Sequence, residues 1–184
     1  MNAHLQPSGS AYFIDNVKPA VETHALAVIV DNEPGVLARV VGLFSGRGYN
    51  IESLTVAEVA HAEHRSRITI VTSGAPETID QIHHQLERIV PVRQVTDLTV
   101  SKRSLERELA MVKVRGQGDD RANALQLAEA FRARVVDATT ESFIFELTGR
   151  PDKIDEFVDL MRPIGLVEVS RTGVAAISRG PDPI

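Results

Sequence analysis

The chain of 184 residues contains no cysteine and no tryptophan, and aromatic residues make up only 4% of it. Without cysteine there are no disulfides, thiolate nucleophiles or cysteine-ligated metals, a composition typical of a reducing compartment. The formal net charge of -5 argues against a nucleic-acid surface, because phosphate binding needs clustered Lys and Arg, and base stacking needs exposed aromatic rings. We therefore expect small molecules or other proteins as partners, and no nucleic acid.

Long hydrophobic runs are also missing. No apolar run approaches the roughly 20 residues that a membrane helix needs. The first 23 residues have neither the apolar core of a signal peptide nor the Arg-rich character of a transit peptide. We expect a cytoplasmic protein without membrane contact, with a flexible N-terminal extension over residues 1–23.

The 43% of hydrophobic residues follow patterns that predict alternating strands and helices. The apolar run "HALAVIV" predicts a strand, and the spacing of three and four residues from Val36 to Phe44 predicts a helix that ends at "GRG". The expected elements are strand 24–30, helix 36–44, strand 49–59 with a possible bulge, strand 67–73, helix 74–90 and strand 92–100. This β-α-β-β-α-β order is that of a ferredoxin-like fold, with an antiparallel sheet and two helices on one face.

The second half repeats this order of elements. We therefore expect an α+β protein with two tandem ferredoxin-like domains, residues 24–100 and 109–184. The charged stretch 101–108 is expected to link them, and residues 173–180 are expected to form a short tail.

The usual sets of catalytic residues are missing from this pattern. His61 and His64 fall in a predicted hairpin connection, and the adjacent His83 and His84 should point about 100° apart on a helix. "RGQG" at 115–118 is too short for a phosphate-binding loop and predicts a turn, and the acidic residues of 152–160 predict a solvated helix face. We expect no catalytic residue and no metal site.

The stretch "DNEPG" before the first helix allows two interpretations. Asn, Pro and Gly are common turn formers, so a purely structural strand-to-helix connection accounts for Asn32, Pro34 and Gly35. Alternatively, Gly35 leaves the free amides at the helix N-terminus open to a carboxylate, and Asn32 offers both a donor and an acceptor. Asn50 begins a predicted edge strand, so it could close such a pocket from a second copy of the chain.

The blocks "NEPGVLARVVGLFSGRGYNIESLTV", "SRITIV" and "ERELAMVKV" resemble the regulatory (small) subunit of acetohydroxyacid synthase, also called acetolactate synthase. The resemblance covers about residues 25–179. The long block is the specific part, because "PGVLARV" alone is shared by many ACT domains, the amino-acid-binding modules to which this family belongs.

The resemblance implies a subunit without an active site that activates a catalytic subunit and confers feedback inhibition by valine or a related branched-chain amino acid. It implies a homodimer, with thiamine diphosphate, magnesium and FAD on the catalytic partner and no cofactor on this chain. The effector would lie between two first domains, an ACT domain from each chain. Carried over by position, the effector-binding residues are Asn32, Gly35, Val36 and Leu37 of one chain, with Asn50 and Ile51 of the other. Ala38 stands where some relatives carry a small hydroxyl residue, and the second, ACT-like domain has no matching turn.

Three other functions remain as alternatives. The first is an ACT-type amino-acid sensor that controls a different metabolic enzyme or a transcription factor, although no basic segment or helix-turn-helix supports the latter. An acylphosphatase-like hydrolase would need an arginine in the first loop, where the sequence has "DNEPG". An RNA-binding domain would need aromatic residues on the central strands, where the sequence has Ile, Val and Thr.

Overall fold

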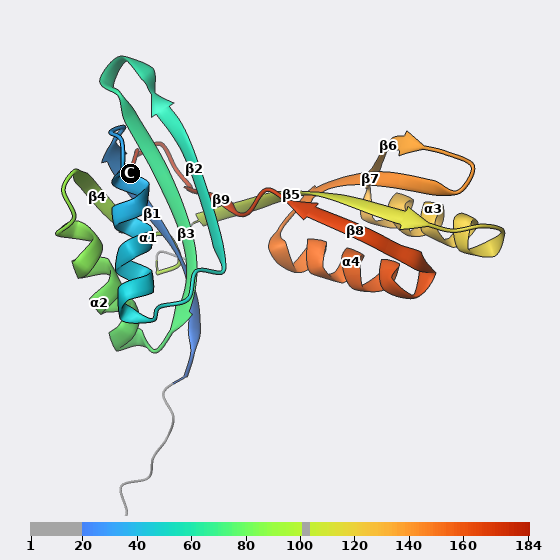
Figure 1. The fold of residues 1–184 in the computed structure, drawn as a ribbon, viewed down its shortest axis with the longest axis horizontal. Coiled ribbons are helices and arrows are strands. Elements are labelled where there is room, and N and C mark those ends of the chain that lie inside the picture. The colour runs from blue at the N-terminus through green and yellow to red at the C-terminus, as the bar shows by residue number, and fades with distance from the viewer. Residues whose placement is uncertain (1–19, 101–103) are drawn as a thin grey trace, which may run out of the picture.

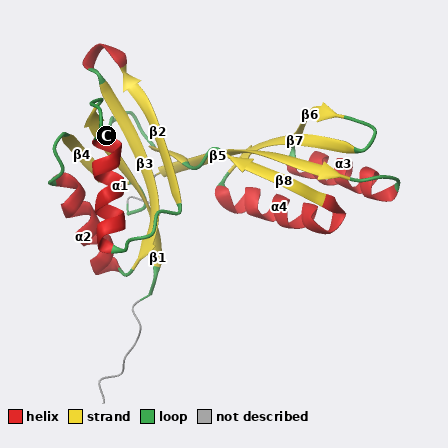
Figure 2. Cartoon of the chain, in the orientation of Figure 1, coloured by secondary structure: helices red, strands yellow, loops and turns green. Residues whose placement is uncertain are grey.

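A computed structural model describes residues 20–100 and 104–184 and contains two antiparallel sheets, each covered on one face by a pair of helices (Figures 1 and 2). In both halves the chain order is strand, helix, strand, strand, helix, strand. The expected α+β class with two tandem ferredoxin-like domains is therefore confirmed.

The first domain has the sheet order β2-β3-β1-β4, so β2 is an edge strand as predicted. Its elements are β1 (Glu22–Asp31), α1 (Val36–Arg47), β2 (Ser53–Ala60), the short 3-10 helix η1 (His61–Glu63), β3 (Arg65–Gly74), α2 (Pro76–Glu87) and β4 (Val92–Asp97). The β2–β3 register shifts between Glu58 and Ala60, where the sequence had suggested a bulge. Because β2 begins at Ser53, Asn50 and Ile51 precede the strand instead of opening it.

The core of the first domain follows from the alternation of side chains along β1. Leu26, Val28 and Val30 point toward the helices and join Val40 and Phe44 of α1 in one buried cluster. Burial of a large aliphatic or aromatic side chain contributes about 1.5–3 kcal/mol relative to exposure. The three- and four-residue spacing read from the sequence therefore identifies the face by which α1 is held on the sheet.

The second domain repeats the topology with the sheet order β6-β7-β5-β8. Its elements are β5 (Ser104–Arg115), α3 (Asp119–Phe131), β6 (Arg134–Ala138), β7 (Ser142–Gly149), α4 (Pro151–Gly165), β8 (Leu166–Arg171) and the additional strand β9 (Ala175–Ser178). Phe145 of β7 and Phe157 of α4 are fully buried, and their rings meet edge to face with centroids 6.2 Å apart. The two rings join the sheet to the helix layer.

The expected linker and the expected tail are both wrong in part. β5 begins at Ser104, so residues 104–108 belong to a strand, and the segment 173–180 contains β9, which pairs with Ser104–Arg107. Val174 and Ala176 of this segment pack on the face of the first sheet opposite the helices. The end of the chain thus returns to the first domain, as Figure 1 shows.

Parts of two predicted segments lie outside the described residues. They are residues 1–19 of the expected N-terminal extension and residues 101–103 of the expected linker. Of the expected extension, Glu22 and Thr23 already form part of β1. Among the described helices, none is both long and apolar enough to span a membrane.

Candidate effector site

The turn between β1 and α1 has a backbone conformation that the sequence did not specify. Gly35 is the N-cap of α1 and has a φ of 86°, in the left-handed region. A Cβ atom at this position would meet no atom within 4 Å, but side-chain-bearing residues rarely adopt this φ. Pro34 and Gly35 both precede the helix, which begins at Val36.

The N-terminus of α1 presents free amides to the surface. No side chain caps the helix, and the Val36 and Arg39 amides donate to the carbonyls of Glu33 and Gly35. Within the described residues the amides of Leu37 and Ala38 find no acceptor. Since the helix dipole places positive potential here, this end of α1 is suited to a carboxylate.

Polar groups from three other segments surround this end. The backbone amide of the exposed Asn32 donates to the His64 carbonyl at 2.6 Å, and its side-chain amide makes no hydrogen bond to the residues that the structure describes. Arg93 of β4 donates two hydrogen bonds from Nε and one from Nη2 to the carboxylate of Asp31. These hydrogen bonds hold the pKa of Asp31 below its usual value and raise that of Arg93. Because Arg93 neutralises the Asp31 carboxylate, Asp31 does not cancel the positive potential at the neighbouring N-terminus of α1.

This ion pair could not be read from a local sequence pattern, because Arg93 lies 62 residues beyond Asp31 in the chain. The antiparallel pairing of β1 with β4 brings the two residues together. A sheet order assigned from the ferredoxin-like pattern could have suggested the pair, since β4 runs beside β1 in that order.

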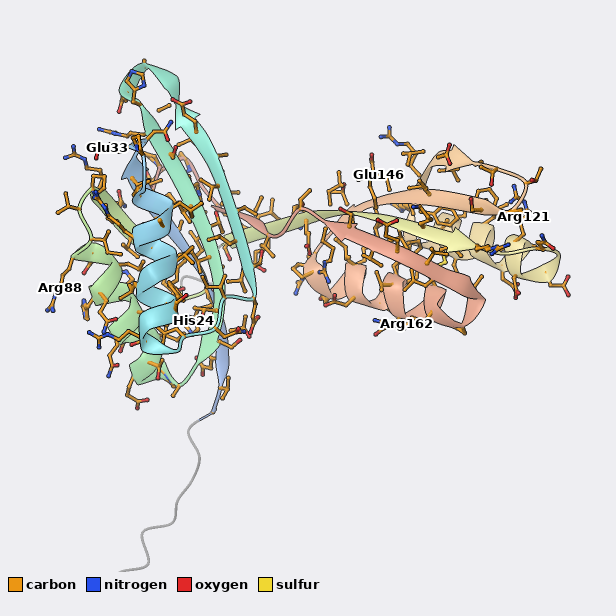
Figure 3. All side chains as sticks on the ribbon, viewed as in Figure 1. His24, Glu33, Arg88, Arg121, Glu146 and Arg162 are labelled. Atoms are coloured by element: carbon orange, nitrogen blue, oxygen red, sulfur yellow. The ribbon has the colours of Figure 1, made fainter. Side chains whose placement is uncertain are left out.

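The six predicted effector residues form two groups at opposite ends of α1. Asn50 and Ile51 follow the C-terminus of the helix, which spans 12 residues and thus about 18 Å at 1.5 Å per residue. Figure 3 shows Glu33 beside one end of α1 and His24 near the other. Within one chain the two groups are too far apart to enclose a small ligand. A pocket shared by two chains agrees with this separation and stays a prediction.

Exposure differs among the six residues. Asn32, Gly35 and Asn50 are exposed, Leu37 is 38% exposed, and Ile51 packs partly against the core of the first domain. Val36 is only 7% exposed and belongs to that core. Val36 could therefore offer a ligand little more than its backbone.

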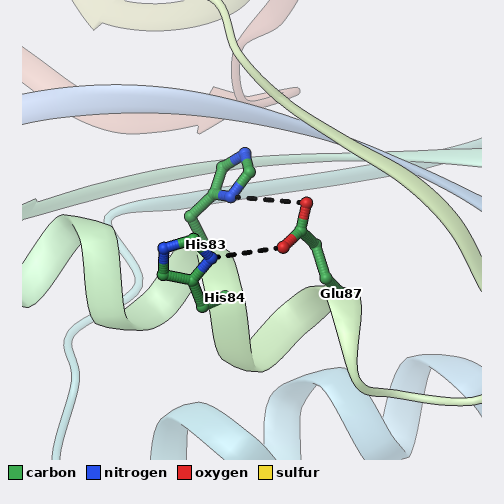
Figure 4. A group of neighbouring side chains, drawn as sticks. All are labelled: His83, His84 and Glu87. Atoms are coloured by element: carbon green, nitrogen blue, oxygen red, sulfur yellow. Dashed lines mark hydrogen bonds and ion pairs between the residues drawn. The ribbon is translucent and has the colours of Figure 1, made fainter.

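The geometry of His83 and His84 differs from the expectation. Their ligand atoms and those of Glu87 lie within 4.8 Å of one another on α2 (Figure 4). The Nδ1 atoms of His83 and His84 lie 3.8 Å and 3.3 Å from separate oxygens of Glu87. The expectation that adjacent histidines must diverge is wrong, because rotation about the side-chain bonds turns both rings toward the next helical turn. Contacts at spacings of three and four residues are also ordinary on a helix surface.

The remaining sequence candidates lie on loops or exposed faces. His64 has an exposed side chain and a φ of 49°, while the side chain of His61 is outside the part that the structure describes. Gly118 of "RGQG" precedes α3 in a turn, as predicted. The four acidic residues of α4 are solvent-exposed, as predicted for a solvated face, and three of them pair with arginines: Asp152 with Arg150, Asp155 with Arg171, and Asp159 with Arg162.

A cleft of about 800 Å³ lies between the two domains, and none of the six predicted residues lines it, although Glu52 next to Ile51 does. On its second-domain side Arg171 donates to both oxygens of the buried Glu108, at 2.9 and 2.6 Å, and to Asp155 at 2.6 Å. The hydrogen bonds that Arg171 donates to Glu108 raise the pKa of Arg171. Because these charges satisfy one another, we assign them to the connection between the domains and not to a ligand.

The architecture is that of two tandem ACT-type domains, and the open N-terminus of α1 belongs to the first of them. A family model described as an AHAS small subunit-like ACT domain matches residues 26–94, and one described as the small subunit of acetolactate synthase matches residues 107–180. The chain belongs to the acetolactate synthase small-subunit family.

Individual relatives match over most of the chain. A probable acetolactate synthase small subunit of Archaeoglobus fulgidus is 45% identical over 157 residues, which cover 85% of this chain and 97% of that protein. The acetolactate synthase small subunit of Mycolicibacterium smegmatis is 41% identical over 159 residues, covering 86% and 92%. The crystal structure of the small subunit from Thermotoga maritima aligns with a TM-score of 0.78 and 36% identity, covering 88% of this chain and 99% of that one.

Proposed function

We propose that this chain activates the catalytic subunit of acetolactate synthase and makes it sensitive to feedback inhibition by valine or a related branched-chain amino acid. Membership of the small-subunit family implies a catalytic partner subunit. Feedback requires the effector to bind the inhibited state of the complex better than the active state. In this proposal the chain supplies the effector site, while the partner supplies the chemistry with thiamine diphosphate, magnesium and FAD, in the cytoplasm.

The uncapped N-terminus of α1 is the observation that carries the effector site. Two free amides, a glycine N-cap and the exposed Asn32 lie together there. They offer donors to the carboxylate of an amino acid, and the Asn32 side chain also offers an acceptor to its ammonium group. Asn50 and Ile51 of a second copy would close the site around the apolar side chain.

Reconstitution with the catalytic subunit tests the proposal. The isolated chain should form no acetolactate, addition to its partner should raise the rate, and valine should lower the raised rate. Acetolactate formation by the chain alone would refute a purely regulatory role. Failure to raise the partner's rate would favour an ACT-type sensor of a different enzyme.

The choice among valine, leucine and isoleucine needs a separate measurement. The three differ by about one methylene or its position, which is worth roughly 1–3 kcal/mol in an apolar pocket. Calorimetric titration of the purified chain with each amino acid would rank them directly.

A further inference from the structure

The second domain is attached to the strand that follows Asn50 and Ile51 in the first. Ser53 Oγ of β2 accepts a hydrogen bond from the Val174 amide at 2.8 Å, and Thr55 Oγ1 donates to the Val174 carbonyl at 3.1 Å. Both polar groups of one peptide segment are thus bound by side chains two residues apart on the same face of β2. We call Ser53, Thr55, Gly173 and Val174 the interdomain latch.

The latch is tight on the side of the second domain. Gly173 has a φ of 82°, and a Cβ atom there would lie 2.8 Å from Ser53 Oγ and 3.0 Å from Thr55 Cγ2. Val174 is 5% exposed and packs with Ala25 and Ala27 on the outer face of the first sheet. A glycine that permits close contact next to a buried anchor gives the segment little freedom to slide.

The latch continues directly into the second sheet. The Thr172 amide donates to the Leu109 carbonyl at 3.0 Å, and Thr172 Oγ1 accepts from the Leu109 amide at 3.1 Å. One residue earlier, Arg171 is held by Glu108 and Asp155. A shift of residues 173–174 would therefore be transmitted to β5, the strand that pairs with both β7 and β8.

On the side of the first domain, the latch is connected to the predicted effector residues Asn50 and Ile51. Thr72 Oγ1 of β3 donates to the Asn50 carbonyl at 2.6 Å, and the Glu52 amide donates to the Val71 carbonyl at 2.8 Å. Ser53 pairs with the same Val71. Only two residues, Ile51 and Glu52, separate Asn50 from the first latch residue, so a ligand that moves Asn50 acts on the beginning of β2.

We propose that the interdomain latch reports effector occupancy at Asn50 and Ile51 to the second domain. This inference rests on the proposed function, since it assigns the route by which that effector site controls the rest of the subunit. A second contact supports it: Arg67 of β3 donates to the Ala176 carbonyl. Arg67 is partly buried at this contact, and the burial lowers the pKa of its guanidinium.

The first test uses the unaltered protein. Hydrogen exchange of the Val174 amide, measured on the reconstituted complex with and without valine, should change by about threefold or more, because opening of a hydrogen-bonded amide controls its exchange. Valine that binds and inhibits without changing this exchange overturns the latch and leaves the proposed function standing. Wild-type protein that binds none of valine, leucine and isoleucine overturns both.

The second test removes the two hydroxyl groups with Ser53→Ala and Thr55→Val together. Each rate is divided by the same variant's valine-free rate, so that any change in activation is separated from inhibition. The valine Kd should stay within about threefold of wild type, while the inhibition reached at saturating valine should fall to about half or less, as expected for weakened coupling.

A matched control removes the same kinds of group elsewhere. Thr139→Val with Ser142→Ala deletes a hydroxyl pair 2.9 Å apart, between the turn after β6 and the first residue of β7, and should leave inhibition as in wild type. Equal inhibition in the latch variant and this control, with melting temperatures that show both folded, overturns the inference. If the latch variant does not fold, the hydrogen exchange of the Val174 amide in the unaltered protein decides between the two outcomes.

Discussion

Gly35 meets two requirements at one position. Its φ of 86° turns the chain into α1, and its lack of a side chain leaves the amides of the first helical turn open. The first requirement concerns stability and the second concerns ligand binding. A substitution can separate them only if a control carries the same backbone strain without the same charge.

Gly35→Asp and Gly35→Asn provide that comparison. Asp and Asn tolerate the left-handed conformation better than other side chains, at a cost of about 1 kcal/mol. The Asp carboxylate would compete with the effector carboxylate for the helix end, so Gly35→Asp should weaken valine binding by about tenfold or more. Gly35→Asn should lose distinctly less affinity. Calorimetric titration of both variants with valine measures the two affinities. Equal losses of affinity would mean that backbone strain, and not the added charge, disturbs the site.

The sequence revealed the residue types of this turn but not its conformation. Asn, Pro and Gly predict a turn, yet Pro34 and Gly35 are compatible with positions inside or before a helix. The structure places Gly35 at the N-cap and buries Val36 in the core. These details depend on how α1 packs on the sheet, and a local pattern does not contain that information.

The beginning of strand β5 could not be predicted from the sequence, because it contains a buried charged residue. Residues 104–108 carry alternating charges that suggest a solvated linker, but Glu108 is only 5% exposed. Its partner Arg171 comes from β8, 63 residues later in the chain. The periodic apolar elements were predictable because each one shows its own buried face, whereas a buried ion pair is visible only once the sheet is assembled.

Glu108→Gln tests whether this pair supports the joint between the domains. The amide keeps the shape of the carboxylate but gives Arg171 a neutral partner, and partial exposure of Arg171 moderates the loss through solvent screening. We expect the free energy of unfolding in urea to fall by about 1–2 kcal/mol.

Glu106→Gln is the control for this change. Glu106 lies on the same strand, and its carboxylate makes no hydrogen bond or ion pair with the residues that the structure describes, while its backbone carbonyl accepts from Arg107. Its free energy of unfolding should stay within about 0.5 kcal/mol of wild type. A loss as large as that of Glu108→Gln would show that negative charge on β5, and not the pair with Arg171, matters.

The assembly of two chains follows from the separation of the effector residues along α1. If Asn32 and Gly35 of one chain and Asn50 and Ile51 of another hold the same ligand, the ligand binds the dimer and not the monomer. Mass action then requires valine to strengthen dimerisation, by a factor that grows with the ratio of free valine to its Kd. The exposed edge of β2 offers a surface through which such a pair of chains could meet.

Sedimentation across a dilution series, with and without valine, measures this linkage. The isolated protein should be at least a dimer at micromolar concentration, and saturating valine should shift the dimer–monomer midpoint to lower concentration by about tenfold or more. Asn50→Ala removes a ligand contact from one side of the shared site, so it should reduce the shift. Leu160→Ala, at an exposed position on α4 far along the chain, should leave it unchanged. A 20.1 kDa monomer that binds valine as tightly as the dimer would contradict a shared site, because a ligand with equal affinity for both states cannot move the equilibrium between them.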